Sequence, residues 1–258
     1  MFSKTGVQHD GSETQEYYLN GKLEGKRKTW YFDGQPETDE FYRNGKLEGY
    51  RKEWHENGQL SHLEFFRDGK REGTHEYWYD NGKLCAQAFY RNDELEGVRK
   101  AYFPDGQLDN CTSYHEGRLD GEFKAWYYNG NQATQEFFRN NKRDGQRKSW
   151  YRNGQLSMLT FYRDERPEGK FQSWHTNGRP NVQAFYRNGR MEGERKAYYP
   201  DGQLWMREFC RNNASIDRNF TFTKKQIFIR VIKRFRKRAI DSMNSVIISD
   251  LMKIIYRI

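Results

Sequence analysis

The fold is decided by residues 41–60, FYRNGKLEGYRKEWHENGQL. This stretch contains two Asn-Gly pairs, Asn44-Gly45 and Asn57-Gly58, which favour tight hairpin turns because Asn and Gly tolerate a positive φ. The runs between the pairs are too short for helices and are rich in aromatic residues, as β-strands are. We therefore predict two antiparallel strands and two turns in this segment.

The segment belongs to a unit of 24 residues that recurs eight times without a gap, from about residue 18 to residue 209. One register of glycines follows Glu or Asp, and a second follows Asn or Asp. A third register, at Gly45, is looser, because Asp93, Asn141 and Glu165 replace its glycine in three units. We assign the first two registers as turn glycines: Gly25, Gly49, Gly73, Gly97, Gly121, Gly145, Gly169 and Gly193, and Gly34, Gly58, Gly82, Gly106, Gly130, Gly154, Gly178 and Gly202.

Eight such units predict an all-β repeat, an elongated single-layer antiparallel meander of about sixteen strands that ends in a short α-helical tail. The domain boundaries that follow are a degenerate lead-in at 1–16, the repeats at 17–211 and a basic amphipathic tail at 212–258. At about 4.8 Å per strand the meander would extend about 75 Å.

Composition agrees with a thin sheet, because only 34% of residues are hydrophobic and the mean hydropathy is -1.20, yet 17% are aromatic. The aromatic residues follow the repeat in ladders. The tryptophan ladder has two interpretations, cross-strand packing that holds the sheet together or an interaction surface. Its tryptophans are Trp30, Trp54, Trp78, Trp126, Trp150 and Trp174.

No enzyme, cofactor or metal site is expected. The sequence lacks the common nucleophile, zinc-protease and phosphate-loop motifs, and its acidic residues recur in every unit rather than at one singular site. The three cysteines, Cys85, Cys111 and Cys210, have no disulfide or zinc spacing. With neither a signal sequence nor an apolar stretch of spanning length, a cytoplasmic protein is expected.

The unit at 41–60 resembles the variant form of the MORN repeat, and the resemblance covers about three quarters of the chain. It implies an elongated single-layer sheet used in protein assembly and, in some relatives, in association with phospholipid membranes. It also implies antitoxin-like or large-virus relatives, hence a virion-associated location as an alternative. Departures from the pattern are Ser113 for an aromatic residue, His55 and His175 in an aromatic register, read as ring substitutes, and Pro36 and Pro180 for Leu.

The tail supplies most of the net charge, with 11 Lys and Arg against 3 Asp and Glu in 212–258, or +8 of the total +9. Apolar residues recur there at helical spacing, which predicts two amphipathic helices. They would cap the last strand, bind an anionic membrane or acidic partner, or form homo-oligomers. Nucleic acid is the least favoured partner, for lack of a motif. The proposed anionic-partner residues are Lys224, Lys225, Arg230, Lys233, Arg234, Arg236, Lys237 and Arg238.

We therefore expect a non-catalytic scaffold that presents an extended aromatic and charged β surface to protein partners. Two alternatives remain: a peripheral protein that binds anionic phospholipid through the tail, and an antitoxin-like inhibitor of a partner protein.

Overall fold

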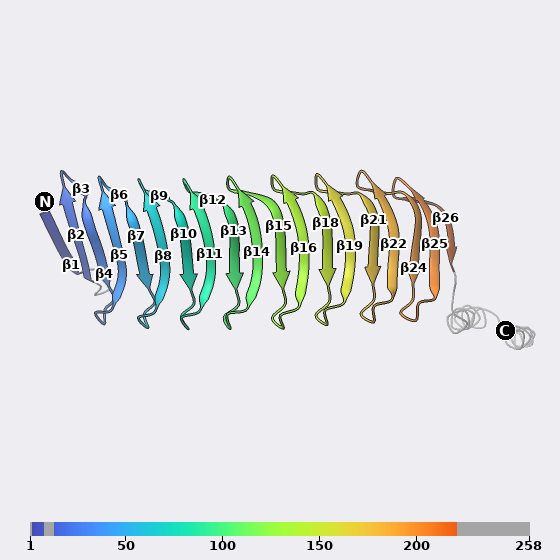
Figure 1. The fold of residues 1–258 in the computed structure, drawn as a ribbon, viewed down its shortest axis with the longest axis horizontal. Helices are drawn as coiled ribbons and strands as arrows, with labels where there is room; N and C mark the ends of the chain where they lie inside the picture. The colour runs from blue at the N-terminus through green and yellow to red at the C-terminus, as the bar shows by residue number, and fades with distance from the viewer. Residues whose placement is uncertain (1, 8–12, 221–258) are drawn as a thin grey trace, which may run out of the picture. The chain divides into compact units, whose positions relative to one another are not determined.

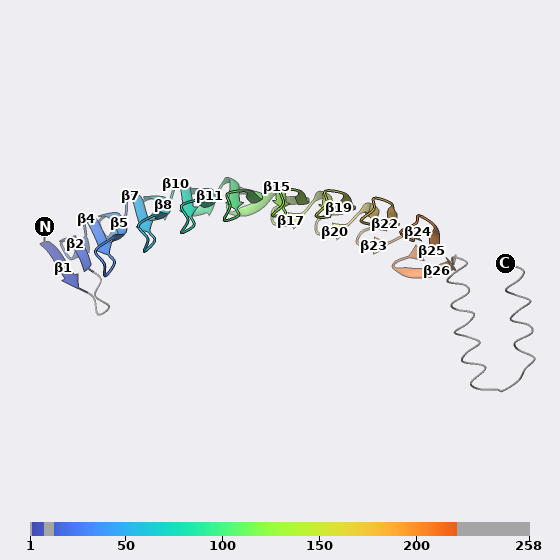
Figure 2. The ribbon, with the colours of Figure 1, turned by 90° about the horizontal axis from the view of Figure 1, so that it is seen from below.

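A computed structural model describes residues 2–7 and 13–220. Its contacts divide the chain into two units, Met1–Arg166 and Pro167–Ile258. In each unit the described residues form antiparallel strands in sequence order, joined by tight turns and arranged in one layer (Figures 1 and 2). The predicted all-β repeat architecture is confirmed within each unit.

Each repeat begins with a long strand. After the first one, these strands start two residues after a glycine of the Gly58 register, and four of them end in Phe-Tyr-Arg. They are β2 (Glu13–Leu19), β5 (Pro36–Arg43), β8 (Leu60–Arg67), β11 (Leu84–Arg91), β14 (Leu108–His115), β16 (Gln132–Arg139), β19 (Leu156–Arg163), β22 (Pro180–Arg187) and β25 (Leu204–Arg211). Pro36 and Pro180 are first residues of their strands, where a proline removes no ladder hydrogen bond.

The second strand of each repeat, which runs back alongside the long strand and is called the return strand below, is split in two in most repeats. The expected count of about sixteen strands was therefore too low. Its two-residue parts are β3 (Lys22–Leu23), β6 (Lys46–Leu47), β9 (Lys70–Arg71), β12 (Glu94–Leu95), β17 (Lys142–Arg143), β20 (Arg166–Pro167) and β23 (Arg190–Met191). Its six-residue parts are β4 (Gly25–Trp30), β7 (Gly49–Trp54), β10 (Gly73–Trp78), β13 (Gly97–Tyr102), β18 (Gly145–Trp150), β21 (Gly169–Trp174) and β24 (Gly193–Tyr198). In one repeat the strand is continuous, as β15 (Arg118–Trp126).

The return strand is split by a bulge at the Gly49 register. The prediction that this register consists of turn glycines was therefore wrong. Leu47 pairs with Tyr42 and Lys52 with Asp39, so the return strand advances five residues (52 − 47) while β5 advances three (42 − 39). Gly49 lies at this bulge with φ 82°, a conformation that favours glycine. The Glu-Gly signature therefore marks a bend inside a strand. Local sequence could not separate it from a turn because both need a positive φ.

The two true turns differ in geometry. Asn44 and Gly45 both have positive φ, 52° and 78°, as a two-residue type I′ hairpin requires. Asp93, Asn141 and Glu165 also have positive φ, so the substituted units keep the same turn. In the Gly58 register the amide of Gly58 donates a hydrogen bond of 2.8 Å to the carbonyl of His55. Gly58 is the one residue of this turn with a positive φ. That register forms a type I turn followed by a bulge residue.

In seven repeats the acidic residue before the bulge glycine ties one repeat to the next. The Glu48 carboxylate accepts a hydrogen bond of 2.9 Å from the amide of Asp68, twenty residues onward in the following type I′ turn. The same bond recurs at Glu24–Asn44, Glu72–Asn92, Glu96–Glu116, Asp120–Asn140, Glu168–Asn188 and Glu192–Asn212. These carboxylates therefore satisfy backbone donors, which explains why an acidic residue recurs in this register.

Both ends of the repeat region extend beyond the predicted boundaries. The lead-in contains a strand, β1 (Phe2–Val7), which pairs with β2. Past residue 211, Asn212 and Asn213 form another turn of positive φ, and β26 (Ala214–Phe220) pairs with β25. The boundary at 211/212 was thus set too early, because the turn lacks glycine. The predicted helices and the eight basic tail residues lie outside the described residues.

Candidate interaction surface

The two faces of the single layer have opposite characters. Alternation along β5 puts Thr38, Glu40 and Tyr42 on one face and Asp39, Phe41 and Arg43 on the other. We call the first the ladder face and the second the phenylalanine face, and extend both names to the residues that occupy equivalent positions in the other repeats. Buried residues gather on the ladder face, where Glu40, Glu64 and Glu136 are each less than 8% exposed.

A chain of ion pairs runs across the ladder face of the first unit. The Arg27 guanidinium bridges Glu16 and Glu40 at 2.9 Å each, and Arg51 bridges Glu40 at 2.8 Å and Glu64 at 2.7 Å. His75, fully buried, follows with Nδ1 3.5 Å from Glu64. Glu40 thus lies between arginines from both neighbouring strands, and Glu64 lies between Arg51 and the His75 ring. The sequence analysis did not predict this network.

The network changes composition along the sheet in a coordinated way. Where the equivalent of Glu40 is alanine, the paired arginine is replaced too, by His75 opposite Ala88 and by Phe171 opposite Ala184. Glu136 faces Phe123 and pairs with Arg143 at 2.7 Å and with Arg147 at 3.1 Å. In the second unit Arg195 pairs with Glu208 at 2.6 Å. The recurrence of Arg and Glu 13 residues apart, at 27/40, 51/64 and 195/208, was the sequence signal for the network.

Burial and pairing shift the protonation of these groups. Burial alone would raise the pKa of Glu40, but hydrogen bonds from Arg27 and Arg51 lower it below its usual range. The pKa of Glu64 is lowered to about 2, because contacts from His75, Arg51 and Tyr77 outweigh its burial. Burial and the Glu40 charge raise the pKa of Tyr42 to about 12. The carboxylates are therefore ionised in the folded sheet.

We expect acid to weaken the sheet through these carboxylates. A carboxyl group with a depressed pKa stabilises the fold above its unfolded pKa of about 4.5 and loses that contribution as the pH falls towards 2. For Glu64 the loss is at most about 3 kcal/mol. Urea unfolding between pH 7 and pH 2.5 should show Glu64→Gln less stable than the parent at pH 7 but less sensitive to acid. Parallel pH profiles for the two proteins would contradict this role.

Aromatic rings complete the ladder face and one edge of the sheet. The His75 ring lies between Phe66 and Tyr90, at centroid distances of 5.6 and 4.7 Å. At the edge, the hydroxyls of Tyr31, Tyr79 and Tyr127 donate to the carbonyl of the residue 23 positions onward, at 2.6 to 2.8 Å. His55 and His175 make the same bond through Nε2 at 2.9 Å, so the interpretation of both histidines as ring substitutes is confirmed.

The tryptophans predicted as a possible interaction surface are half-buried; they end six-residue strands, except Trp126, which ends the continuous strand β15. The Tyr31 and His55 bonds, for example, run to the carbonyls of Trp54 and Trp78. The tryptophans therefore form part of the framework, and their role in binding stays a prediction. Within the described ranges, no cluster of His, Cys, Asp and Glu has the arrangement of a metal site, and Cys85, Cys111 and Cys210 are not joined in disulfides.

The exposed apolar side chains lie mainly on the phenylalanine face. Phe41, Phe89, Phe185 and Phe209 are 37 to 39% exposed, and Tyr50 and Val98, which pair with the same register, are 61% and 50% exposed. Ser113 takes the equivalent position in β14. Because a monomer in water gains nothing from exposing such a row, its presence is typical of a docking surface.

Cations flank this phenylalanine row. On one side lies the register of Arg43 and its hairpin partner Lys46, which is exposed and basic in most repeats, the exceptions being Leu19, Glu94 and His115. On the other side lies the register of Lys52, which pairs with Asp39. Each row lies about 7 Å from the phenylalanines, two residues along a strand. The face thus combines apolar rings with positive charge.

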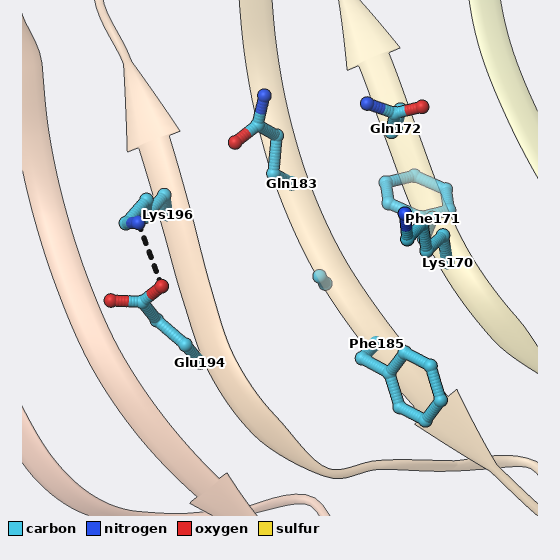
Figure 3. A pocket seen from close by; sticks show the side chains of 8 residues that line it. Lys170, Phe171, Gln172, Gln183, Phe185, Glu194 and Lys196 are labelled. Carbon is cyan, nitrogen blue, oxygen red and sulfur yellow. Dashed lines mark ion pairs between the residues drawn. The ribbon is translucent and has the colours of Figure 1, made fainter.

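In the second unit this face contains a depression of about 310 Å³ (Figure 3). Phe185 and Gln183 come from β22, Lys170 and Gln172 from β21, and Glu194 and Lys196 from β24. Ala184 lines it too. Lys196 is bound to Glu194 at 2.7 Å, and Arg207 reaches the same carboxylate at 2.5 Å. The site offers amides, cations and a ring, but no arrangement of nucleophile and base.

None of the described residues forms a helix with the length and apolarity needed to cross a bilayer. No curated protein matches the sequence. Among solved structures, the TcdB2–TccC3 complex matches with a TM-score of 0.22 at 13% identity, over 85% of this chain and 15% of that one. The Photorhabdus luminescens Tc holotoxin pore matches with a TM-score of 0.23 at 14% identity, over 85% and 14% of the two chains. The chain thus spans about one seventh of these structures, and scores this low carry no argument.

The MORN repeat variant family matches at residues 23–44, 47–68, 71–92, 95–116, 143–164 and 191–209. The matched segments each run from a return strand through the next long strand, so they follow the structural repeat. The hairpins between the matched segments, β15–β16 and β21–β22, have the same strand pairing. They also have the same register shift at the tryptophan that precedes the type I turn. The chain is a member of the MORN repeat variant family.

Proposed function

We propose that the protein is a non-catalytic scaffold that binds partner proteins on its phenylalanine face. The observation that carries this proposal is the segregation of exposed rings and cations onto one face, while the buried ion pairs and the tyrosine register occupy the other. A face that the sheet does not need for its own cohesion is available for a partner. The setting remains as expected from the sequence, cytoplasmic or virion-associated.

The test is a comparison of captured partners. Full-length protein with Phe41, Phe89, Phe185 and Phe209 all changed to Ser should lose the proteins that co-purify with the parent. Serine already occupies this register at Ser113, so the change suits the strand. The control changes four exposed turn residues, Gln59, Gln107, Gln155 and Gln203, to Ser and should retain them. An identical partner set for parent and four-phenylalanine variant would overturn the proposal.

The second candidate is peripheral binding to anionic phospholipid, supported by the exposed Arg43 and Lys46 registers beside apolar rings. Co-flotation with anionic and neutral vesicles at low and high salt tests it. Charge reversal at Arg230, Lys233, Arg234 and Lys237 should abolish salt-sensitive flotation if the tail anchors the protein. Unchanged flotation would assign binding elsewhere. The antitoxin-like role has no observation of its own in the structure.

A further inference from the structure

We propose that the phenylalanine face of the second unit binds an acidic amphipathic α-helix of a partner protein, with one bulky apolar side chain in the depression beside Phe185. This inference rests on the proposed function and specifies the chemistry of the partner. It uses only residues of β21, β22, β23, β24 and β25, whose pairings within the unit are continuous.

The charge of this surface selects an acidic partner. Over β21 to β25 it carries six cations, Lys170, Arg187, Arg190, Lys196, Arg207 and Arg211, against one carboxylate, Glu194; a second acidic residue, Asp217 of β26, pairs with Phe209 at the end of the row. Glu194 is already held by Lys196 and Arg207. The exposed side chains of Lys170, Arg187 and Arg211 have no carboxylate at ion-pair distance within the described part of the chain. A row of partner carboxylates would complete these pairs.

The apolar features form a line rather than a patch. Phe185 and Phe209 occupy the same register one repeat apart and are 37% and 39% exposed. Two strand spacings separate them, about 9.6 Å. Two turns of an α-helix rise about 10.8 Å, so apolar residues seven positions apart would meet successive phenylalanines. The depression of about 310 Å³ lies beside the first of them and is large enough for a leucine or an aromatic side chain.

The width of the surface favours a helix over a single nucleic-acid strand. The register of Gln183 and Lys196 lies on one side of the phenylalanines and the register of Arg187 and Arg190 on the other. These registers are about 14 Å apart, which suits a helix of about 10–12 Å diameter with carboxylates on both flanks. A single strand that stacked its bases on the rings would place its phosphates along one side only.

The experiment uses the full-length protein and a fluorescent synthetic peptide of about 18 residues, five helical turns, with leucines at every third or fourth position and glutamates on both flanks. Fluorescence anisotropy should show saturable binding. A peptide of the same composition without a continuous leucine stripe should bind at least about tenfold more weakly. A single-stranded oligouridine of matched length is the nucleic-acid probe.

Phe185→Ser and, separately, Lys170→Glu should each weaken binding of the peptide with the continuous leucine stripe at least about tenfold. Gln203→Ser, in an exposed turn, should leave binding within about twofold. The basic tail is unchanged in every variant, so binding to it would persist equally. The proposal of a helical partner would be overturned if both peptides bound equally or if Phe185→Ser left peptide binding unchanged. Tighter binding of the oligouridine that depends on Phe185 would overturn it too. The proposed scaffold function would still be supported after such a result if the four-phenylalanine variant loses the proteins that co-purify with the parent.

Discussion

Glu40→Ala is expected to lower the free energy of unfolding by about 3 kcal/mol. The side chain is 5% exposed and lies between Arg27 and Arg51, at 2.9 and 2.8 Å. Removal of one partner from a buried pair typically costs about 3–5 kcal/mol, because the remaining charge stays desolvated. We expect the lower end, since both guanidiniums are 27% exposed and keep a second carboxylate. Urea unfolding at pH 7 measures the change.

Asp39→Ala is the matched control, because Asp39 is the preceding residue of the same strand and faces the other way. Its pair with Lys28, at 3.5 Å, is one-third exposed on both sides. Surface pairs of this kind contribute at most about 1 kcal/mol. If Asp39→Ala and Glu40→Ala destabilise equally, the ion pairs of the ladder face do not hold the strands together.

Gly145→Ala is expected to cost about 3 kcal/mol. Gly145 has φ 124°, which L residues rarely adopt, and its added Cβ would lie 3.0 Å from the Cβ of Phe137 on the neighbouring strand. Backbone strain of this kind costs about 1–3 kcal/mol, and displacement of the ring adds to it. Thermal or urea unfolding of the purified variant gives the value.

Gly97→Ala separates the two causes. Gly97 lies at the same bulge position with φ 75°, but nothing lies within 4 Å of its added Cβ. Its cost should be about 1 kcal/mol, the strain of a left-handed residue alone. Similar losses for the two variants would show that contact with Phe137 does not contribute.

Local chemistry made most of the fold predictable. The Asn-Gly and Asp-Gly pairs marked the hairpins, and the fixed spacing of aromatic residues set the strands, because each turn here is specified by its own residues. The bulge at Gly49 was mistaken for a turn, since glycine after an acid signals only a positive φ. The role of Glu48 depends on a turn amide in the next repeat, a contact that no single unit contains.

The faces were harder to predict than the strands. Alternation shows that Phe41 and Tyr42 point in opposite directions, but not which of them is covered. Burial is decided by long side chains from neighbouring strands, such as Arg51 spanning Glu40 and Glu64. The candidate interaction surface therefore moved from the tryptophans to the phenylalanine row once cross-strand contacts were known.

The most direct test of this division of roles is the free energy of unfolding of two adjacent variants in β11, Phe89→Ser and Tyr90→Ser. Phe89 is 39% exposed, whereas Tyr90 packs on His75 and lies beneath the Arg71 guanidinium at 4.2 Å. We predict a loss of about 2 kcal/mol for Tyr90→Ser, below that of a fully buried ring, and under about 1 kcal/mol for Phe89→Ser. Equal losses, or a larger loss at Phe89, would show that the phenylalanine face also holds the sheet together and would contradict its assignment as the free, partner-binding face.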